Sequence, residues 1–135
     1  MMAVEDSEFP QFPKNFNAIT VKPEKITVNG GEWKAEVIIE NQGPNPILFK
    51  VKVTNNKRCR VNNCADVIMQ NKTVTVSLQG TGVEPKDEDR LIIIYTQYTT
   101  PTIVVPNAFL AWQRAKTRDV ISKSMTIPFE KEVKC

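Results

Sequence analysis

The sequence predicts an all-β protein, a two-sheet antiparallel sandwich built from about seven short strands. Short stretches that alternate apolar and polar residues recur along the chain and are separated by turn residues, whereas helical periodicity occurs in a single stretch. Nine prolines against five glycines also favour extended segments and sharp turns. With 135 residues, 41% of them hydrophobic and 24% charged, the chain is expected to form one ordinary globular domain.

The first strands follow from alternation and from one proline. Residues 19–21 and 26–28 are two extended pieces, and Pro23 between them suits an edge strand that breaks and changes partner. Residues 33–40 form a second strand with Trp33 on its apolar side. Residues 49–54 alternate most strictly, so Phe49 is predicted to face the core.

The middle of the chain is predicted to carry fewer strands. Residues 55–60 are a basic turn, 62–66 a loop and 67–69 a short apolar piece. A further strand is expected over 73–78. Residues 90–96 are apolar on both faces, which places them in the centre of a sheet.

The C-terminal part is predicted to hold a short helix and a closing strand. Residues 108–116 place alanines and Trp112 on one helical stripe. Residues 124–129 alternate again, and Pro128 favours an edge position for that strand. The chain is thus divided into an irregular arm (1–17), the sandwich domain (18–130) and a tail (131–135). The arm's phenylalanines are expected to lie on the domain surface, and docking of the arm onto a partner is the alternative.

Composition excludes several classes of function. A net charge of +3 is too mild for a nucleic-acid-binding protein, and the absence of histidine removes the commonest general base and metal ligand. No signal peptide and no membrane span are apparent. We therefore expect a cytoplasmic, non-enzymatic protein with no catalytic residue, cofactor or metal.

The three cysteines and the acidic loop support the same expectation. An odd cysteine count with no Cys-x-x-Cys favours reduced thiols, although a Cys59–Cys64 pair is an alternative. The acidic cluster at 84–89 lacks the ordered ligand spacing of a calcium loop. It is interpreted as a solvated loop that ends at Asp89.

Five segments occur in the order typical of one family. The run 49–58 (Phe-Lys-Val-Lys-Val-Thr-Asn-Asn-Lys-Arg) resembles the signature of major sperm protein (MSP) domains, in which such a strand leads into a basic turn. Residues 23–29 resemble the family's opening edge strand and 89–96 its late central strand. The segments 109–112 and 125–128 are similar to the Trp-containing piece and closing strand of the sperm proteins. The resemblance implies an immunoglobulin-like, seven-stranded antiparallel sandwich.

The family has two functional branches, and the resemblance is nearer to the first. Sperm cytoskeletal members assemble into dimers and filaments of amoeboid sperm, or regulate that assembly. Vesicle-associated members use a basic groove to bind acidic peptides that contain phenylalanines. The resemblance therefore implies a protein partner, either a second copy, a filament component or an acidic peptide.

The groove of the second branch, together with two cations of the basic turn, gives seven candidate partner-binding positions in this chain. Those positions are Lys50, Lys52, Thr54, Lys57, Arg58, Arg90 and Ile92. Three departures weaken the match: Val53 replaces the first of two threonines, Ile92 replaces a flexible methionine, and Asn62-Asn63 stand where the family usually has proline. The sperm-cytoskeletal function is thus the leading hypothesis, and peptide binding is the alternative. Lysines that serve only solubility and edge protection are the simplest alternative for this basic face.

Overall fold

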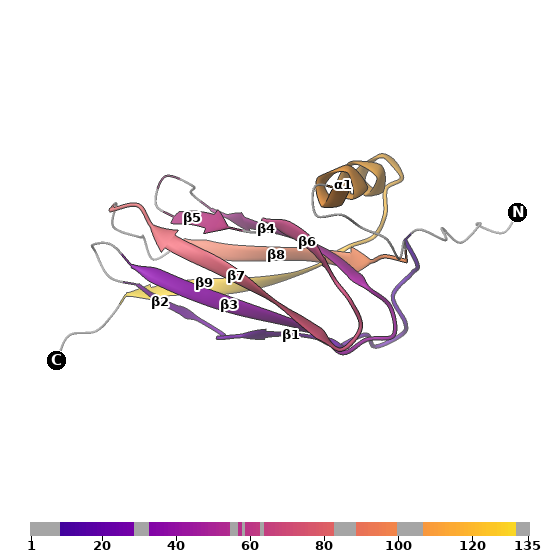
Figure 1. The fold of residues 1–135 in the computed structure, drawn as a ribbon, viewed down its shortest axis with the longest axis horizontal. Coiled ribbons are helices and arrows are strands. Elements are labelled where there is room, and N and C mark those ends of the chain that lie inside the picture. The colour runs from indigo at the N-terminus through magenta and orange to yellow at the C-terminus, as the bar shows by residue number, and fades with distance from the viewer. Residues whose placement is uncertain are drawn as a thin grey trace, which may run out of the picture.

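The computed structural model describes residues 9–28, 33–54, 57, 59–62, 64–82, 89–99 and 107–131. Two β-sheets face each other in this part of the chain, and one helix covers the outside of one sheet (Figure 1). The four-stranded sheet has the order β1-β3-β7-β5. Its strands are β1 (Ile19–Lys22), β3 (Lys34–Asn41), β7 (Lys72–Gly80) and β5 (Cys59–Asn62).

The five-stranded sheet has the order β2-β9-β8-β4-β6. Its strands are β2 (Ile26–Val28), β9 (Lys123–Lys131), β8 (Arg90–Gln97), β4 (Ile47–Val53) and β6 (Ala65–Ile68). The helix α1 spans Asn107–Thr117, close to the predicted 108–116. The predicted sandwich is confirmed, and β8 occupies the central position expected of residues 90–96.

The described residues form nine strands rather than seven. The opening segment gives two strands, because β1 pairs with β3 in one sheet whereas β2 pairs with β9 in the other. This is the change of partner that Pro23 predicted. The two additions are β5 and β6, which replace the predicted basic turn and loop between residues 57 and 66.

Two further expectations about pairing were wrong. The β2–β9 pair is parallel, so the sandwich is not purely antiparallel. The closing strand β9 lies between β2 and β8 and is therefore interior, despite Pro128. The proline is tolerated because pairing with β2 begins only at Phe129, one residue later.

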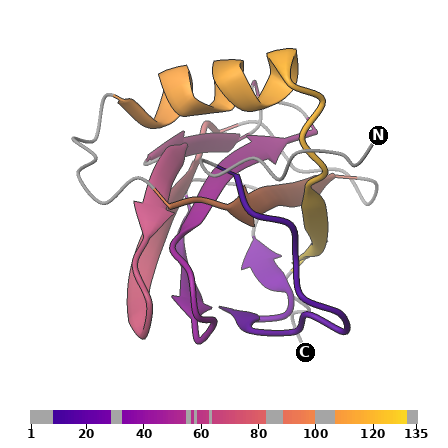
Figure 2. The ribbon, with the colours of Figure 1, turned by 90° about the vertical axis from the view of Figure 1, so that its right-hand side faces the viewer.

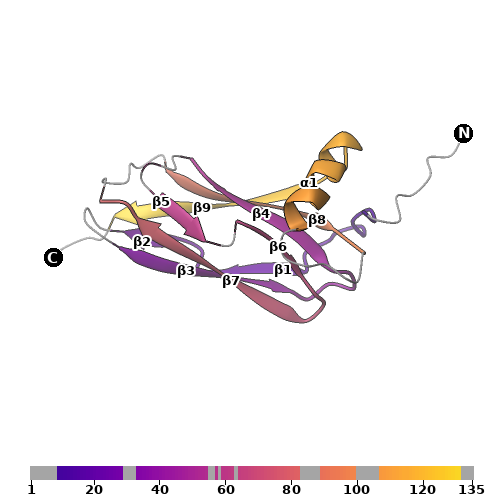
Figure 3. The same cartoon turned by 45° about the horizontal axis from the view of Figure 1, so that its top comes forward.

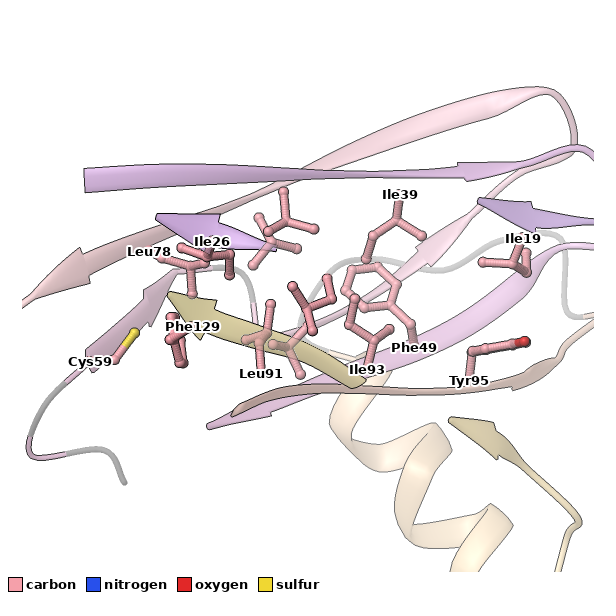
Figure 4. Close-up of a cluster of buried hydrophobic side chains, with 14 of the residues drawn as sticks. Ile19, Ile26, Ile39, Phe49, Cys59, Leu78, Leu91, Ile93, Tyr95 and Phe129 are labelled. Carbon is pink, nitrogen blue, oxygen red and sulfur yellow. The ribbon is translucent and has the colours of Figure 1, made fainter. Parts of the chain in front are cut away.

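The main core lies between the two sheets. Alternation along the strands sends one set of apolar side chains inward, and Phe49, Ile39 and Ile93 are almost fully buried among them. Figure 4 shows Phe49 and Ile93 facing Ile39 across the sandwich. Trp33 and Tyr95 belong to this core, as their sequence context predicted.

A second, smaller core joins α1 to the outer face of the five-stranded sheet. Ala108, Ala111 and Ala115 form the buried stripe of the helix and pack with Leu48 and Ala65 of the sheet. Small alanines let the helix lie close to the strands. Figures 1 and 3 both show α1 beside β6 at one end of the sandwich, and in Figure 2 it lies across the top of the sheet.

Candidate partner-binding surface

The register of β4 against β8 brings three predicted site residues together. Lys52 lies opposite Ile92, and Lys50 lies opposite Ile94 one pair further along. Because Phe49 and Val51 point inward, Lys50 and Lys52 project from the outer face of the sheet. Lys52 is exposed, whereas Lys50 and Ile92 are half-buried. This outer face therefore carries two lysines next to the apolar side chains of Ile92 and Ile94.

Thr54 fixes the position of Arg90 at the end of this face. The Thr54 N–H donates to the Arg90 carbonyl at 3.1 Å, and the Arg90 N–H donates to Thr54 Oγ1 at 3.0 Å. The same hydroxyl donates to Asp89 Oδ1 at 3.3 Å. Arg90 Nη1 in turn donates to the Asp89 carbonyl at 2.7 Å. Asp89 is only 3% exposed, so the expectation that it belongs to a solvated loop is wrong.

The other two predicted site residues lie towards the connection between β4 and β5. Lys57 is exposed, and its carbonyl accepts a hydrogen bond from Thr81 Oγ1 just beyond β7. Its backbone is therefore tied to the four-stranded sheet rather than to the face that carries Lys50 and Lys52. Arg58 lies outside the described residues. The rest of the acidic loop at 83–88 also lies outside them.

A cavity of about 810 Å³ opens between β4 and β5, where the two sheets diverge. We call this cavity the seam. Its lining combines apolar core edges with two cations and consists of Val51, Lys52, Val53, Thr54, Cys59, Arg60, Val61, Asn62 and Cys64. Arg60, which the sequence assigned to the basic face as part of a turn, lies on strand β5 and lines the seam with Lys52.

The seam exists because β4 loses its partner halfway along. Pairing of β4 with β6 ends at Lys50, after which the Val51 N–H still donates to the Cys64 carbonyl at 2.7 Å. Backbone groups two residues apart point to the same side of a strand, so those of Val53 also face the seam. They have no strand partner there among the residues that the structure describes. Across the seam, β5 is the edge strand of the other sheet.

A smaller cavity, about 280 Å³, lies where α1 meets the outer face. Lys50, Trp112 and Lys116 line it, and the Lys50 ammonium lies 4.8 Å from the centre of the Trp112 ring. Burial lowers the pKa of Lys50, and repulsion from Lys52 and Lys116 lowers it further. Positive charge is thus concentrated here at an energetic cost. An anionic partner would relieve that cost.

The buried thiol of Cys59 is not an activated nucleophile. Cys59 and Cys64 are free thiols, so the alternative of a disulfide between them is excluded in this structure. Burial raises the pKa of Cys59 to about 11, which keeps its thiol protonated at neutral pH. No group of metal-ligating side chains gathers within the described ranges. No helix in the described part of the chain is long and apolar enough to cross a membrane.

Comparisons with known proteins agree with this architecture. A family model described as the MSP (Major sperm protein) domain matches residues 18–117. The structure of SSP-19, an MSP-domain protein like family member in Caenorhabditis elegans, is 23% identical with a TM-score of 0.69, over 84% of this chain and 99% of that one. WR4, a C. elegans MSP family member, is 15% identical with a TM-score of 0.70, over 87% and 100% of the two chains.

A more distant likeness shows the fold alone. The PapD-like domain 7 of human CEP192 is 8% identical with a TM-score of 0.57, and the match covers 98% of this chain and 96% of that one. No curated protein sequence matches this chain significantly.

Proposed function

We propose, for a chain that belongs to the MSP domain family, that it is a module of the sperm-cytoskeletal branch and works by pairing strand edges with a partner. Family members are generally non-enzymatic and act through protein–protein contacts, and the finer assignment is our own. The partner is a second copy of the chain or a filament component in the cytoplasm. The observation that carries this proposal is the seam, where, among the described residues, β5 is an edge strand and β4 extends beyond its pairing with β6.

Strand addition suits the seam for two reasons. Within the described part of the chain, the backbone groups of Val53 and the outer edge of β5 have no strand partner, and an extended segment would supply hydrogen bonds to them. The apolar side chains of Val51 and Val61 provide contacts for alternate side chains of such a segment. Lys52 and Arg60 at its rim favour an acidic segment and affect mainly the rate of association.

Sedimentation velocity over a concentration series, at low and moderate salt, tests homotypic assembly. We expect a reversible dimer or larger species in the wild type. Val61→Lys places a charge on the β5 edge and is expected to shift the protein to monomer. The matched control is Val74→Lys, a half-buried valine on the interior strand β7. A wild type that stays monomeric at all concentrations overturns homotypic assembly.

The basic face favours a second candidate, the binding of an acidic, phenylalanine-containing peptide. Lys50, Lys52 and Arg90 supply charge around the apolar Ile92, in the arrangement that peptide binding needs. We expect Lys52→Glu to weaken binding of such a peptide at least tenfold and to reduce its salt dependence. Lys34→Glu on β3 is the control, since it makes the same charge change at an exposed site on the other sheet. Equal affinities for the two variants would exclude this face as the binding site.

A further inference from the structure

The described end of the N-terminal arm is held firmly beside α1. The Phe9 ring is 3% exposed and lies 5.3 Å from the Tyr98 ring, with the Arg118 guanidinium 5.6 Å from its centre. Gln97 Nε2 donates to the carbonyls of Pro10 and Gln11. The position of Phe9, to which residues 1–8 are attached, is therefore fixed.

Cations surround this point. Arg118 contacts Phe9, and Arg114 Nη2 donates to the Tyr98 hydroxyl at 3.0 Å. Lys116 and Lys50 line the neighbouring cavity beneath α1, to which Asp119 contributes a carboxylate. The helix itself, Asn107–Thr117, contains no acidic residue. We define the α1 cationic patch as Lys50, Arg114, Lys116 and Arg118.

The eight residues before Phe9 carry the complementary charge. They contain Glu5, Asp6 and Glu8 and no lysine or arginine. An extended chain spans about 3.4 Å per residue, so Glu5 lies within about 14 Å of the fixed Phe9. The helix α1, with 11 residues, is about 16 Å long. The acidic tract is thus long enough to reach the patch without moving Phe9.

We propose that the acidic tract at residues 5–8 docks on the α1 cationic patch of its own chain. The short tether from Phe9 holds the tract at an effective concentration of about a millimolar or more, so an intrinsic dissociation constant near a millimolar gives half occupancy. Docking in a second copy lacks this advantage. The carboxylates stabilise the charged form of Lys50, which is disfavoured by burial and by the like charges of Lys52 and Lys116. If the peptide-binding candidate above is correct, the tract also competes with acidic partners for Lys50.

Carboxyl–amine crosslinking of zero length followed by peptide mass spectrometry tests the docking itself. At low salt and low protein concentration we expect links from residues 5–8 to Lys50 or Lys116 in the monomeric product, and loss of these links near 0.5 M salt as charges are screened. Mixing isotopically labelled and unlabelled chains separates links within one chain from links between chains. Links found only between chains, or none to either lysine, overturn the proposal.

Indole NMR signals give a second readout, independent of any partner. Trp112 lines the patch cavity, whereas Trp33 lies in the main core against Phe129. Glu5→Gln/Asp6→Asn is expected to shift the Trp112 indole signal and leave that of Trp33 unchanged. The control Glu24→Gln/Glu36→Gln removes two exposed carboxylates elsewhere and is expected to move neither signal. An unmoved Trp112 signal in the first variant contradicts docking.

The competition is tested separately with a synthetic acidic peptide. Glu5→Gln/Asp6→Asn is expected to tighten binding of the peptide about three- to tenfold. The control Glu24→Gln/Glu36→Gln is expected to leave the affinity for the peptide unchanged. If the crosslinks form but the affinity for the peptide does not rise, the tract docks but does not compete for Lys50. A failure of the peptide-binding function would instead leave the crosslinks and the Trp112 shift in place.

Discussion

Asn41 connects the two sheets, and its replacement by alanine is expected to destabilise the fold by about 3 kcal/mol. The side chain is fully buried. Its Nδ2 donates to the carbonyls of Asn45 and Ile68 at 2.9 Å each, and its Oδ1 accepts from the Gly43 N–H at 2.9 Å. Asn41→Ala leaves three backbone groups without these partners, at roughly 1 kcal/mol for each lost hydrogen bond and more where water cannot enter.

Urea unfolding, monitored by tryptophan fluorescence, measures this loss as a lower transition midpoint with an unchanged slope. The control is Gln42→Ala next to it, which removes one exposed hydrogen bond to Glu40 and is expected to cost less than about 0.5 kcal/mol. Equal stability of the Asn41→Ala variant and the wild type would refute the reasoning, because it would mean that water replaces all three bonds at no cost.

Two further predictions concern the main core and the thiols. A Cβ at Gly80 would lie 2.3 Å from Trp33 Nε1 and 2.4 Å from its Cδ1, so Gly80→Ala is expected to cost about 1–3 kcal/mol in chemical denaturation; an unchanged midpoint would contradict this packing. Because the pKa of Cys59 is raised from 9.0 to about 11, its thiolate fraction at pH 8 is about 100-fold below that of an ordinary thiol. Alkylation of Cys59 is therefore expected to be slow at pH 8 and to accelerate up to about pH 11, and rapid labelling in the folded protein at pH 8 would be inconsistent with the buried position.

Much of the fold was predictable because alternation and burial agree along the long strands. Phe49 and Val51 are buried, as their period of two predicted, and the alanine stripe of α1 packs on the sheet. The strand β5 was missed because Lys57, Arg58 and Arg60 resemble a solvated turn. The alternation of Cys59 and Val61 with Arg60 and Asn62 could have indicated this strand, because Cys59 and Val61 are more buried than Arg60 and Asn62.

The candidate surface was less predictable, because it depends on where pairing stops. Lys50, Lys52, Thr54, Arg90 and Ile92 were assigned to one surface from the family resemblance, and the β4–β8 register does place them together. The seam has no local signature, since it arises where β6 ends beside β4 while β5 joins the other sheet. The cavity beneath α1 likewise requires the helix to be placed over Lys50, which no pattern within either segment specifies.

The parallel pairing of β2 with β9 also decides how the protein resists pulling. Strand β1 separates the N-terminal arm from β2, β9 closes the described chain, and Figure 3 shows β2 and β9 side by side. A force applied to the two ends of the chain pulls parallel neighbours in opposite directions along their length. The interstrand hydrogen bonds are then loaded together in shear instead of opening one after another. We therefore expect this short pair to bear load in shear once β1 has separated from β3.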